Sequence, residues 1–481
     1  MSVPSERVRA RNQPAARPER AFVLYWMIAA RRTRFNFALE RAVEAALAWR
    51  KPLVVLEALR CDYPYASDRF HRFVLDGMAD NAARLTGAGI GYRAYVEPAR
   101  GAGKGLLEEL SKQACLVVTD DYPAFFLPRM VETAAKRLDV RLEAVDANGL
   151  LPLKDADHAF PTAYAFRRHL QRRLPPHLTE LPEPDPLAGA GLPPSRFPED
   201  VASRWPSADA LEGLPIDHRI GPVDGVSGGP EAARERLTTF VEERLPGYAE
   251  HRNEPDRETT SGLSPYLHFG HVSIHEVLLA VAGREGWSPA ALSATANGKR
   301  EGWWGLSPSA EAFLDQAVTW RELGFNHAAT GGDDRFESLP AWARRTLAEH
   351  AADPRPHRYD LSALAAGATH DRLWNAAQAQ LVREGRIHNY LRMLWGKKIL
   401  EWTGGPEEAL EVLFELNDRY ALDGRDPNSS SGICWILGRY DRPWGPTRPI
   451  FGTVRYMSSE NTARKLRVKR YLARHAPSPL P

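Results

Sequence analysis

Cysteine is scarce in this sequence, since a chain of 481 residues has only Cys61, Cys115 and Cys434, which lie far apart. Three scattered thiols cannot build a disulfide framework or a cysteine-rich metal site. We therefore expect reduced, structural cysteines and predict no metal. The chain also lacks an apolar run long enough to span a bilayer, and its first twenty residues lack the apolar core of a secretory signal. These absences favour a cytoplasmic protein that does not associate with a membrane.

Net charge is nearly absent as well, because 63 Lys and Arg residues stand against 61 Asp and Glu residues, which leaves +2. Overall charge therefore gives no reason to infer nucleic-acid binding, and a local patch would have to support that inference. Hydrophobic residues make up 43% of the chain and charged residues 26%, which is typical of a globular protein. The length predicts two domains.

The N-terminal part lacks a GxGxxG fingerprint opening a helix. Gly101, Gly103 and Gly105 alternate beside a lysine, but no clear strand precedes them, so a loop is the better interpretation. Strand and helix patterns do alternate here, which predicts a doubly wound parallel sheet of the Rossmann-like class with any ligand at the carboxyl ends of the strands. The expected strands are 21–27, 53–58, 91–96, 115–119 and 141–145, and the expected helices are 36–49, 68–85 and 126–138.

The chain divides into four predicted parts. Residues 1–20 read as a disordered basic tail and 21–150 as the α/β domain. Residues 151–230 are a Pro-rich connection, which between 175 and 230 has almost no periodicity. Residues 231–481 are almost entirely helical in pattern, with helices expected at 231–245, 273–282, 310–323, 340–351, 371–384, 387–402 and 406–416.

The run 416–457 follows neither a helical nor a strand period. It contains Trp435 and Trp444 with arginines between and around them: Arg439, Arg442, Arg448 and Arg455. Flat rings interleaved with guanidinium groups are the composition that stacks bases and holds phosphates. The alternative is a core-forming segment with a solvated basic rim, and for the tryptophans taken alone that alternative is favoured.

Several motifs together resemble the class II cyclobutane pyrimidine dimer photolyases. They are LNDRYALDGRDPN at 416–428, RPW at 442–444, RPIFG at 448–452, SGLSPYLHFG at 261–270, IHNYLRMLWGKK at 387–398 and YWM at 25–27. The resemblance covers nearly the whole chain apart from its Pro-rich middle. It implies an α/β N-terminal domain, an all-α FAD-binding domain, and light-dependent repair of UV-damaged DNA by reduced FAD.

The resemblance also implies a set of flavin contacts. They are Tyr248, Thr260, Ser261, Gly262, Leu263, Ser264, Gln316, Glu322, Asn389, Arg392 and Asp423. From the residues alone, the segment 260–264 could be an ordinary helix cap. Arg392 lies in an apolar stripe and needs a carboxylate if it is buried, and the resemblance supplies Asp423 as that partner.

Three tryptophans match the relay that reduces the flavin in this family, namely Trp374, Trp395 and Trp402. Trp395 and Trp402 are seven residues apart on one predicted helix, roughly 10 Å of rise, which suits electron hopping. Asn417 matches the amide placed near flavin N5, with Asn428 as the second choice. Without the resemblance, these tryptophans would be interpreted as core residues and Asn417 as a cap.

One position departs from the family pattern. A glutamate usually precedes the REL stretch (321–323) and faces the thymine carbonyls, but Gln316 stands there, with Asp315 beside it. An amide can hydrogen-bond a base edge, yet it provides neither a proton nor a charge. We expect this difference to affect the efficiency of dimer splitting.

The sequence therefore predicts a monomeric photolyase whose partner is UV-damaged DNA. Two alternatives stay open at this point: a cryptochrome-like flavin light sensor without repair activity, and a non-catalytic nucleic-acid-binding module. An antenna chromophore, a deazaflavin, is suggested for the N-terminal domain by family analogy alone.

Overall fold

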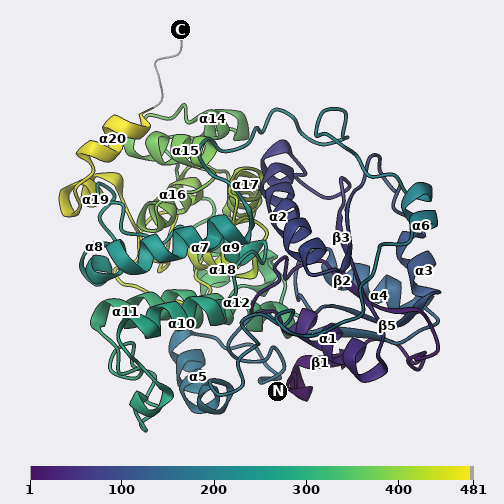
Figure 1. The fold of residues 1–481 in the computed structure, drawn as a ribbon. Helices are drawn as coiled ribbons and strands as arrows, with labels where there is room; N and C mark the ends of the chain where they lie inside the picture. The colour runs from purple at the N-terminus through teal and green to yellow at the C-terminus, as the bar shows by residue number, and fades with distance from the viewer. Residues whose placement is uncertain (1, 477–481) are drawn as a thin grey trace. The chain divides into compact units, whose positions relative to one another are not determined.

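The computed structural model describes residues 2–476, and its N-terminal part contains a six-stranded sheet in the order β1-β6-β5-β2-β3-β4 (Figure 1). Every neighbouring pair is parallel except β1 and β6, which are antiparallel. The order reverses direction between β2 and β5, so this is the doubly wound arrangement that the strand and helix alternation predicts. The fold-class prediction is confirmed.

The elements of the α/β part follow the expected positions closely. The strands are β1 (Val8–Ala10), β2 (Phe22–Met27), β3 (Leu53–Leu59), β4 (Gly91–Val96), β5 (Ala114–Asp120) and β6 (Leu142–Val145). The helices are α1 (Phe37–Trp49), α2 (Asp68–Gly87), α3 (Leu106–Ser111) and α4 (Leu127–Arg137). Asn36 caps α1, because its side chain accepts from the amides of Ala38 and Leu39.

Apolar side chains cover both faces of this sheet. Along β2, Val23, Tyr25 and Met27 pack on one face with α1, whereas Leu24 and Trp26 join α3 and α4 on the other. A strand buried on both faces reads as a continuous apolar run, not as an alternating pattern. This is why FVLYWM is recognisable as a central strand from sequence.

The rest of the described chain is helical. Its helices are α5 (Ala163–His177), α6 (Glu199–Arg204), α7 (Gly229–Thr239), α8 (Tyr248–His251), α9 (Ser264–His268), α10 (Ile274–Arg284), α11 (Pro308–Leu314), α12 (Arg321–Ala329), α13 (Ala341–Glu349), α14 (Leu361–Ala366), α15 (Arg372–Glu384), α16 (Asn389–Trp402), α17 (Pro406–Tyr420), α18 (Pro427–Ile436), α19 (Ser459–Lys465) and α20 (Lys469–His475). Two π-helical stretches, η2 (Phe240–Arg244) and η5 (Asp315–Trp320), continue α7 and α11.

The chain forms two compact units whose limits differ from the predicted domains. The α/β unit comprises 1–157, 172–241 and 262–292, and the helical unit comprises 158–171, 242–261 and 293–481. The connection expected at 151–230 contains the helix α5 as well as the short α6, and its residues from 172 onward belong to the α/β unit. Within that unit, the Ser195 hydroxyl donates to the carbonyl of Leu53.

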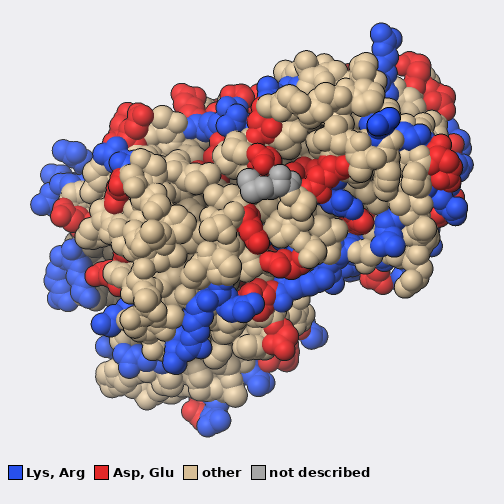
Figure 2. Space-filling view, turned by 60° about the horizontal axis from the view of Figure 1, so that its bottom comes forward, with Lys and Arg blue, Asp and Glu red and all other residues tan. Residues whose placement is uncertain are grey.

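Positive and negative side chains are interspersed over the face shown in Figure 2, in keeping with the net charge of +2. Among residues 2–476, no helix combines the length and the apolar character needed to cross a bilayer.

The expectation of a disordered tail at 1–20 is wrong, because residues 5–7 form a 3-10 turn, η1, and β1 pairs with β6. Arg7 explains the order: its buried guanidinium donates to the carbonyls of Gly149 and Leu150 and pairs with Asp146. Composition alone suggested disorder, but these long-range contacts override it.

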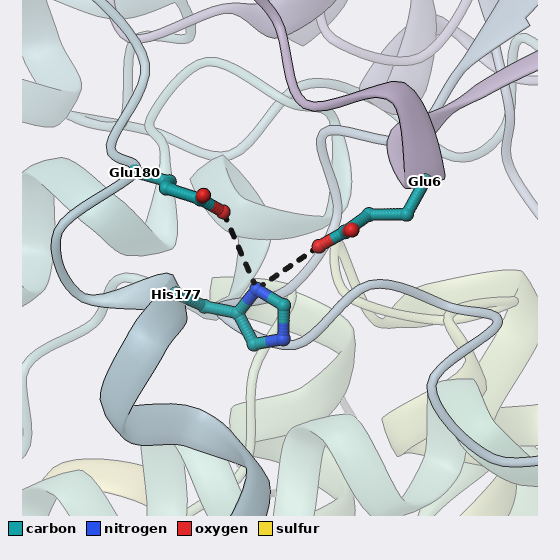
Figure 3. A group of neighbouring side chains, drawn as sticks. All are labelled: Glu6, His177 and Glu180. Atoms are coloured by element: carbon teal, nitrogen blue, oxygen red, sulfur yellow. Dashed lines mark ion pairs between the residues drawn. The ribbon is translucent and has the colours of Figure 1, made fainter.

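A second contact fixes the same end of the chain. The Nδ1 atom of His177 lies 3.2 Å from a Glu6 carboxylate oxygen and 3.8 Å from one of Glu180 (Figure 3). Burial and the charge of Arg7 lower the pKa of His177, against the three carboxylates around it, those of Glu6, Asp155 and Glu180. The cluster ties η1 to the residues that end α5 and follow it.

Asp120, at the carboxyl end of β5, organises the switch point of the sheet. Its Oδ2 accepts hydrogen bonds from the amides of Ile28, Ala29 and Ala30, and its Oδ1 accepts one from the Tyr25 hydroxyl. One carboxylate therefore satisfies the backbone where the chain leaves β2.

Asp120→Asn should lower the free energy of unfolding by about 2 to 4 kcal/mol, because an amide nitrogen would face buried donors. The measurement is a urea titration followed by circular dichroism. Asp139→Asn is the control, since the Asp139 side chain is 61% exposed in its pair with Arg20 and should lose less than about 1 kcal/mol. Equal losses in the two variants would contradict the central role of Asp120.

Candidate flavin and lesion site in the helical unit

Helix α16 is buried around most of its circumference and carries several of the predicted site residues. Arg392, Trp395 and Trp402 all lie on it, and it contacts α15, α17 and α18. Gly396 allows the close approach of α18, since a Cβ at this position would collide with the side chain of Ile436. A helix buried on most of its sides lies at the centre of its unit, although this one includes two lysines, an arginine and a glutamate.

The predicted ion pair forms. An Nη2 of Arg392 donates to Oδ1 of Asp423 at 3.0 Å, with the two side chains 13% and 15% exposed. Asp423 lies in the turn between α17 and α18. A pair this deeply placed is held more firmly than a surface salt bridge, because water screens it less.

Asn417, near the end of α17, is buried beside this turn. Its amide nitrogen donates to Asp418 at 2.8 Å and to the Ser429 hydroxyl at 3.0 Å. Both contacts hold the nitrogen, which leaves the carbonyl oxygen of Asn417 as the atom able to meet a ligand. Asn428 instead lies in the first turn of α18, where its backbone amide is capped by Asp426.

The three tryptophans form one row in which Trp374 is the middle member. Its ring centroid lies 6.5 Å from that of Trp395, with the two rings parallel, and 5.4 Å from that of Trp402, with the rings at 70° to each other. The indole nitrogen of Trp374 also donates to the backbone carbonyl of Trp395 at 2.9 Å. All three are at most 2% exposed. The heptad spacing on α16 thus places the two ends of the row, and α15 supplies the link.

The remaining predicted flavin residues are spread over several elements. Thr260 and Ser261 end one segment of the helical unit, whereas Gly262, Leu263 and Ser264 belong to the α/β unit. Gly262 has a left-handed backbone with φ of 68°, which favours glycine. Next to Thr260, the buried hydroxyl of Thr259 has no hydrogen-bond partner among residues 2–476.

Four others complete the set. Tyr248 is buried at the start of α8 against Phe313, and Glu322 is buried on α12. Asn389 is exposed at the start of α16. Gln316 lies half-buried in the π-helix η5, and such stretches are frequent at functional sites. The neighbouring Asp315 is already paired with Arg167 at 2.7 Å, so it does not replace the missing glutamate.

Trp435 and Trp444 are brought together by one arginine. The guanidinium carbon of Arg455 lies 5.4 Å from the Trp435 ring and 3.9 Å from the Trp444 ring. Asp441 accepts hydrogen bonds from Arg455 at 3.0 Å and from the Trp444 indole at 3.1 Å. Arg442 stacks on Trp444 from 4.6 Å. We call these five residues the indole–arginine cluster.

The other two predicted DNA-contacting arginines differ from each other. Arg448 is exposed and stacks on Tyr456. Arg439 is only 3% exposed and pairs with Asp334 at 2.9 Å, so the expectation that Arg439 holds a phosphate is wrong. The physical reason is that its guanidinium, which follows α18, donates hydrogen bonds to Asp334 and to the carbonyl of Asp333.

Sequence reasoning missed Lys397, which lies beneath this cluster. The ammonium is fully buried, donates to the carbonyl of Ile436 and lies 5.1 Å from the Trp435 ring centroid. Burial is the main reason why the pKa of Lys397 is lowered from 10.5 to about 7, with the Arg455 charge adding to it and Asp441 opposing it. The local sequence held no signal for this, because Lys397 is buried through the packing of α18 against α16.

Lys397 should make stability depend on pH. Its pKa is lower in the folded chain than in the unfolded chain, so between pH values of about 7 and 10.5 the unfolded chain binds more protons and the free energy of unfolding rises with pH. Lys397→Met should flatten this rise, which urea titrations across the window would measure.

Lys398→Met is the matched control, because Lys398 lies on the same helix but pairs with Glu401, and its pKa is raised. It should keep the slope of the parent over this window. If Lys397→Met keeps that slope too, Lys397 is charged in the folded protein at neutral pH.

Comparisons with known proteins identify relatives of this chain. No family model matches the chain. It is 35% identical to a deoxyribodipyrimidine photo-lyase of Methanothermobacter thermautotrophicus, over 98% of both chains, and 35% identical to that of Potorous tridactylus, over 95% of this chain and 82% of the relative. The protein of the same name from Arabidopsis thaliana is 32% identical over 94% of this chain and 88% of the relative.

A solved structure gives independent support for the fold. A bacterial class III photolyase from Agrobacterium tumefaciens superposes with a TM-score of 0.66 over 95% of this chain and 86% of the other, at 18% sequence identity. Identity this low speaks to the fold alone. Near-full-length identity of 35% to the curated relatives speaks to descent, and the chain belongs to the deoxyribodipyrimidine photo-lyase family of enzymes.

Proposed function

We propose that this chain repairs cyclobutane pyrimidine dimers in UV-damaged DNA by light-driven electron transfer, as a class II photolyase. The observation that carries the proposal is the row Trp395–Trp374–Trp402, which begins one helical turn from Arg392. The Arg392–Asp423 pair is where the family resemblance puts the flavin ring. A row of buried, closely spaced indoles starting there would carry electrons to a flavin bound at this pair.

The donors and acceptors in the helical unit fit FAD. Arg392 and Asp423 offer a guanidinium and a carboxylate side by side, Asn417 keeps a carbonyl oxygen uncommitted, and the Thr259 hydroxyl is buried without a partner among the described residues. Thr260 and Ser261 would hold the diphosphate. When bound, FAD supplies light absorption and one-electron chemistry.

The chain's own residues divide the remaining tasks. Asp423 neutralises Arg392 so that the guanidinium does not stand alone in a region of low dielectric. The rings of Trp374, Trp395 and Trp402 carry electrons inward. Trp435 and Trp444 offer indole faces to a flipped-out lesion, and flipping costs less for a damaged, poorly paired step. Arg442 and Arg448, both exposed, would hold backbone phosphates.

Gln316 is the residue at which this site departs from the family pattern, which has a glutamate. Gln316 is half-buried in η5; its amide could bond a thymine carbonyl, but it cannot donate a proton as an acid would. This supports slower splitting than in relatives that have glutamate here. A deazaflavin antenna in the α/β unit and a monomeric state stay predictions of the family resemblance.

The test of the proposal is an assay on an oligonucleotide that contains one dimer. Chemically reduced, flavin-loaded protein should remove the dimer in blue light and not in the dark. Trp374→Phe should repair equally well when chemically pre-reduced, yet lose most of its ability to photoreduce oxidised flavin, because the middle ring of the row becomes harder to oxidise. A parent chain that photoreduces its flavin but leaves dimers intact would be a light sensor, and the repair proposal would be wrong.

The indole–arginine cluster makes a separate prediction about DNA binding. Trp435→Ala or Trp444→Ala should weaken binding to dimer-containing DNA by about 1 to 3 kcal/mol, the range for losing an aromatic stack, with much less effect on undamaged DNA. Arg442→Ala is the contrast, since loss of a phosphate contact should weaken both alike and lower the salt dependence. Matched titrations at two salt concentrations would show this, and an unchanged preference for damaged DNA in the tryptophan variants would remove them from the lesion pocket.

A further inference from the structure

The side chains of Glu6, His177 and Glu180 converge on one point in the α/β unit (Figure 3). The Nδ1 atom of His177 lies 3.2 Å from a carboxylate oxygen of Glu6 and 3.8 Å from one of Glu180. One nitrogen or oxygen atom from each residue lies within 4.8 Å of those from the other two. The flavin contacts, the tryptophan row and the indole–arginine cluster involve none of these residues, so the proposed function does not explain this group. We call these three residues the His177 cluster.

Glu6 is held in place by the backbone of η1 and by its neighbour in the sequence. The backbone amide of Arg7 donates to the carbonyl of Pro4 at 3.0 Å. The buried guanidinium of Arg7 donates to the carbonyl of Leu150 at 2.7 Å. These contacts fix the turn from which Glu6 extends toward the end of α5 (Figure 3).

His177 and Glu180 are brought together by a tight turn at the end of α5. The amide of Glu180 donates to the carbonyl of His177 at 3.4 Å. In a turn with hydrogen bonds between residues three apart, side chains at these two positions lie one above the other. The chain thus supplies a nitrogen ligand and an oxygen ligand from one turn, and η1 adds a second oxygen ligand from a distant part of the sequence.

The distances in the His177 cluster suit a metal ion. Zinc lies about 2.0 to 2.2 Å from imidazole nitrogen and carboxylate oxygen, so two ligand atoms of a tetrahedral site are about 3.4 Å apart. The two distances measured from Nδ1 of His177, 3.2 and 3.8 Å, lie on either side of that value. The carboxylates of Glu6 and Glu180 are half exposed, so they have room for the small shift that a shared ion would require.

Asp155 lies on the other side of the imidazole. One of its carboxylate oxygens is 4.0 Å from Nε2 of His177 and 2.9 Å from the guanidinium of Arg173. A carboxylate on this side favours the tautomer whose proton is on Nε2, and a carboxylate behind a metal-binding histidine is the usual second partner of the ring. The lone pair of Nδ1 is then directed toward Glu6 and Glu180.

The charges around the imidazole also favour a divalent cation. Among residues 2–476, Glu6 and Glu180 pair with His177 and with no lysine or arginine. Arg7, the nearest buried cation, pairs with Asp146 at 3.6 Å. Two carboxylates and a neutral imidazole carry a charge of −2, which an ion of charge +2 balances and an imidazolium alone does not.

We propose that Glu6, His177 and Glu180 bind a divalent transition-metal ion, and that Zn²⁺ suits this ligand set. Imidazole favours zinc and its neighbours over Ca²⁺ and Mg²⁺, which take oxygen ligands. The small number of cysteines argued against a cysteine-rich site, and this site uses none. Because the ion would join segments far apart in the sequence, it would stabilise η1 and β1 against the rest of the α/β unit. The inference does not depend on the proposed repair activity.

The test is a calorimetric titration of the full chain with zinc chloride, after a chelator has been applied and removed. The parent should bind one Zn²⁺ ion per chain, and excess Mg²⁺ or Ca²⁺ should not displace it. His177→Gln should weaken binding by about a hundredfold or more, because it loses the nitrogen ligand. Glu6→Gln and Glu180→Gln should each weaken it by about tenfold to a hundredfold, and these half-exposed positions should tolerate an amide.

His350→Gln is the matched control. His350 and Asp353 also form a histidine–carboxylate pair three residues apart, at 2.6 Å, but among residues 2–476 they belong to no group of three possible ligands. This variant should bind Zn²⁺ as the parent does. If the parent binds no Zn²⁺, or if His177→Gln binds it as tightly as the parent, the proposed site is wrong.

Hydrogen exchange measures the effect on the N-terminal segment independently. In the parent, Zn²⁺ should slow exchange of the β1 backbone amides several-fold, whereas β4, at the opposite edge of the sheet, should not change. In Glu6→Gln, Zn²⁺ should have no effect on β1. Zinc binding that leaves exchange in β1 of the parent unchanged would show that the ion does not join η1 to the end of α5, and would overturn the inference.

Discussion

The packing around α16 is the constraint on which the helical unit depends. One helix of fourteen residues presents Arg392 to Asp423, Trp395 and Trp402 to Trp374, and Lys397 to the carbonyl of Ile436. Each of these contacts needs α15, the α17–α18 turn or α18 to lie close by. Gly396 permits the approach of α18, since a Cβ there would collide with Ile436. A shift of this helix would therefore disturb the ion pair, the tryptophan row and the support beneath Trp435 together.

Long apolar periodic segments were the features that the sequence predicted best. The helix expected at 36–49 is found at Phe37–Trp49, and its cap at Asn36 follows from the residue type. β2 and β5 are buried along their whole length, which is why their continuous apolar runs identify them as strands. The Arg392–Asp423 pair was also anticipated, because an arginine in an apolar stripe requires a partner and the family motif supplied one.

Features that depend on two distant segments meeting were the ones missed. A helical period puts Trp395 and Trp402 on one face of α16, but only the packing of α15 shows that Trp374 separates them. Arg439 has the same local composition as Arg442, and what distinguishes them is Asp334, about a hundred residues earlier. Likewise, the sequence around Val8 does not predict its antiparallel strand pairing with Val145. The local sequence gives the chemistry of a residue, but it does not identify the distant residue that contacts it.

Asp120 has a consequence for what the α/β unit can hold. In doubly wound proteins that bind nucleotides, free backbone amides at the switch point receive a phosphate group. Here the amides of Ile28, Ala29 and Ala30 are already bonded to the chain's own carboxylate. The carboxylate of Asp120 thus occupies the position of the anion, and these three amides cannot at the same time bind a phosphate group of a ligand.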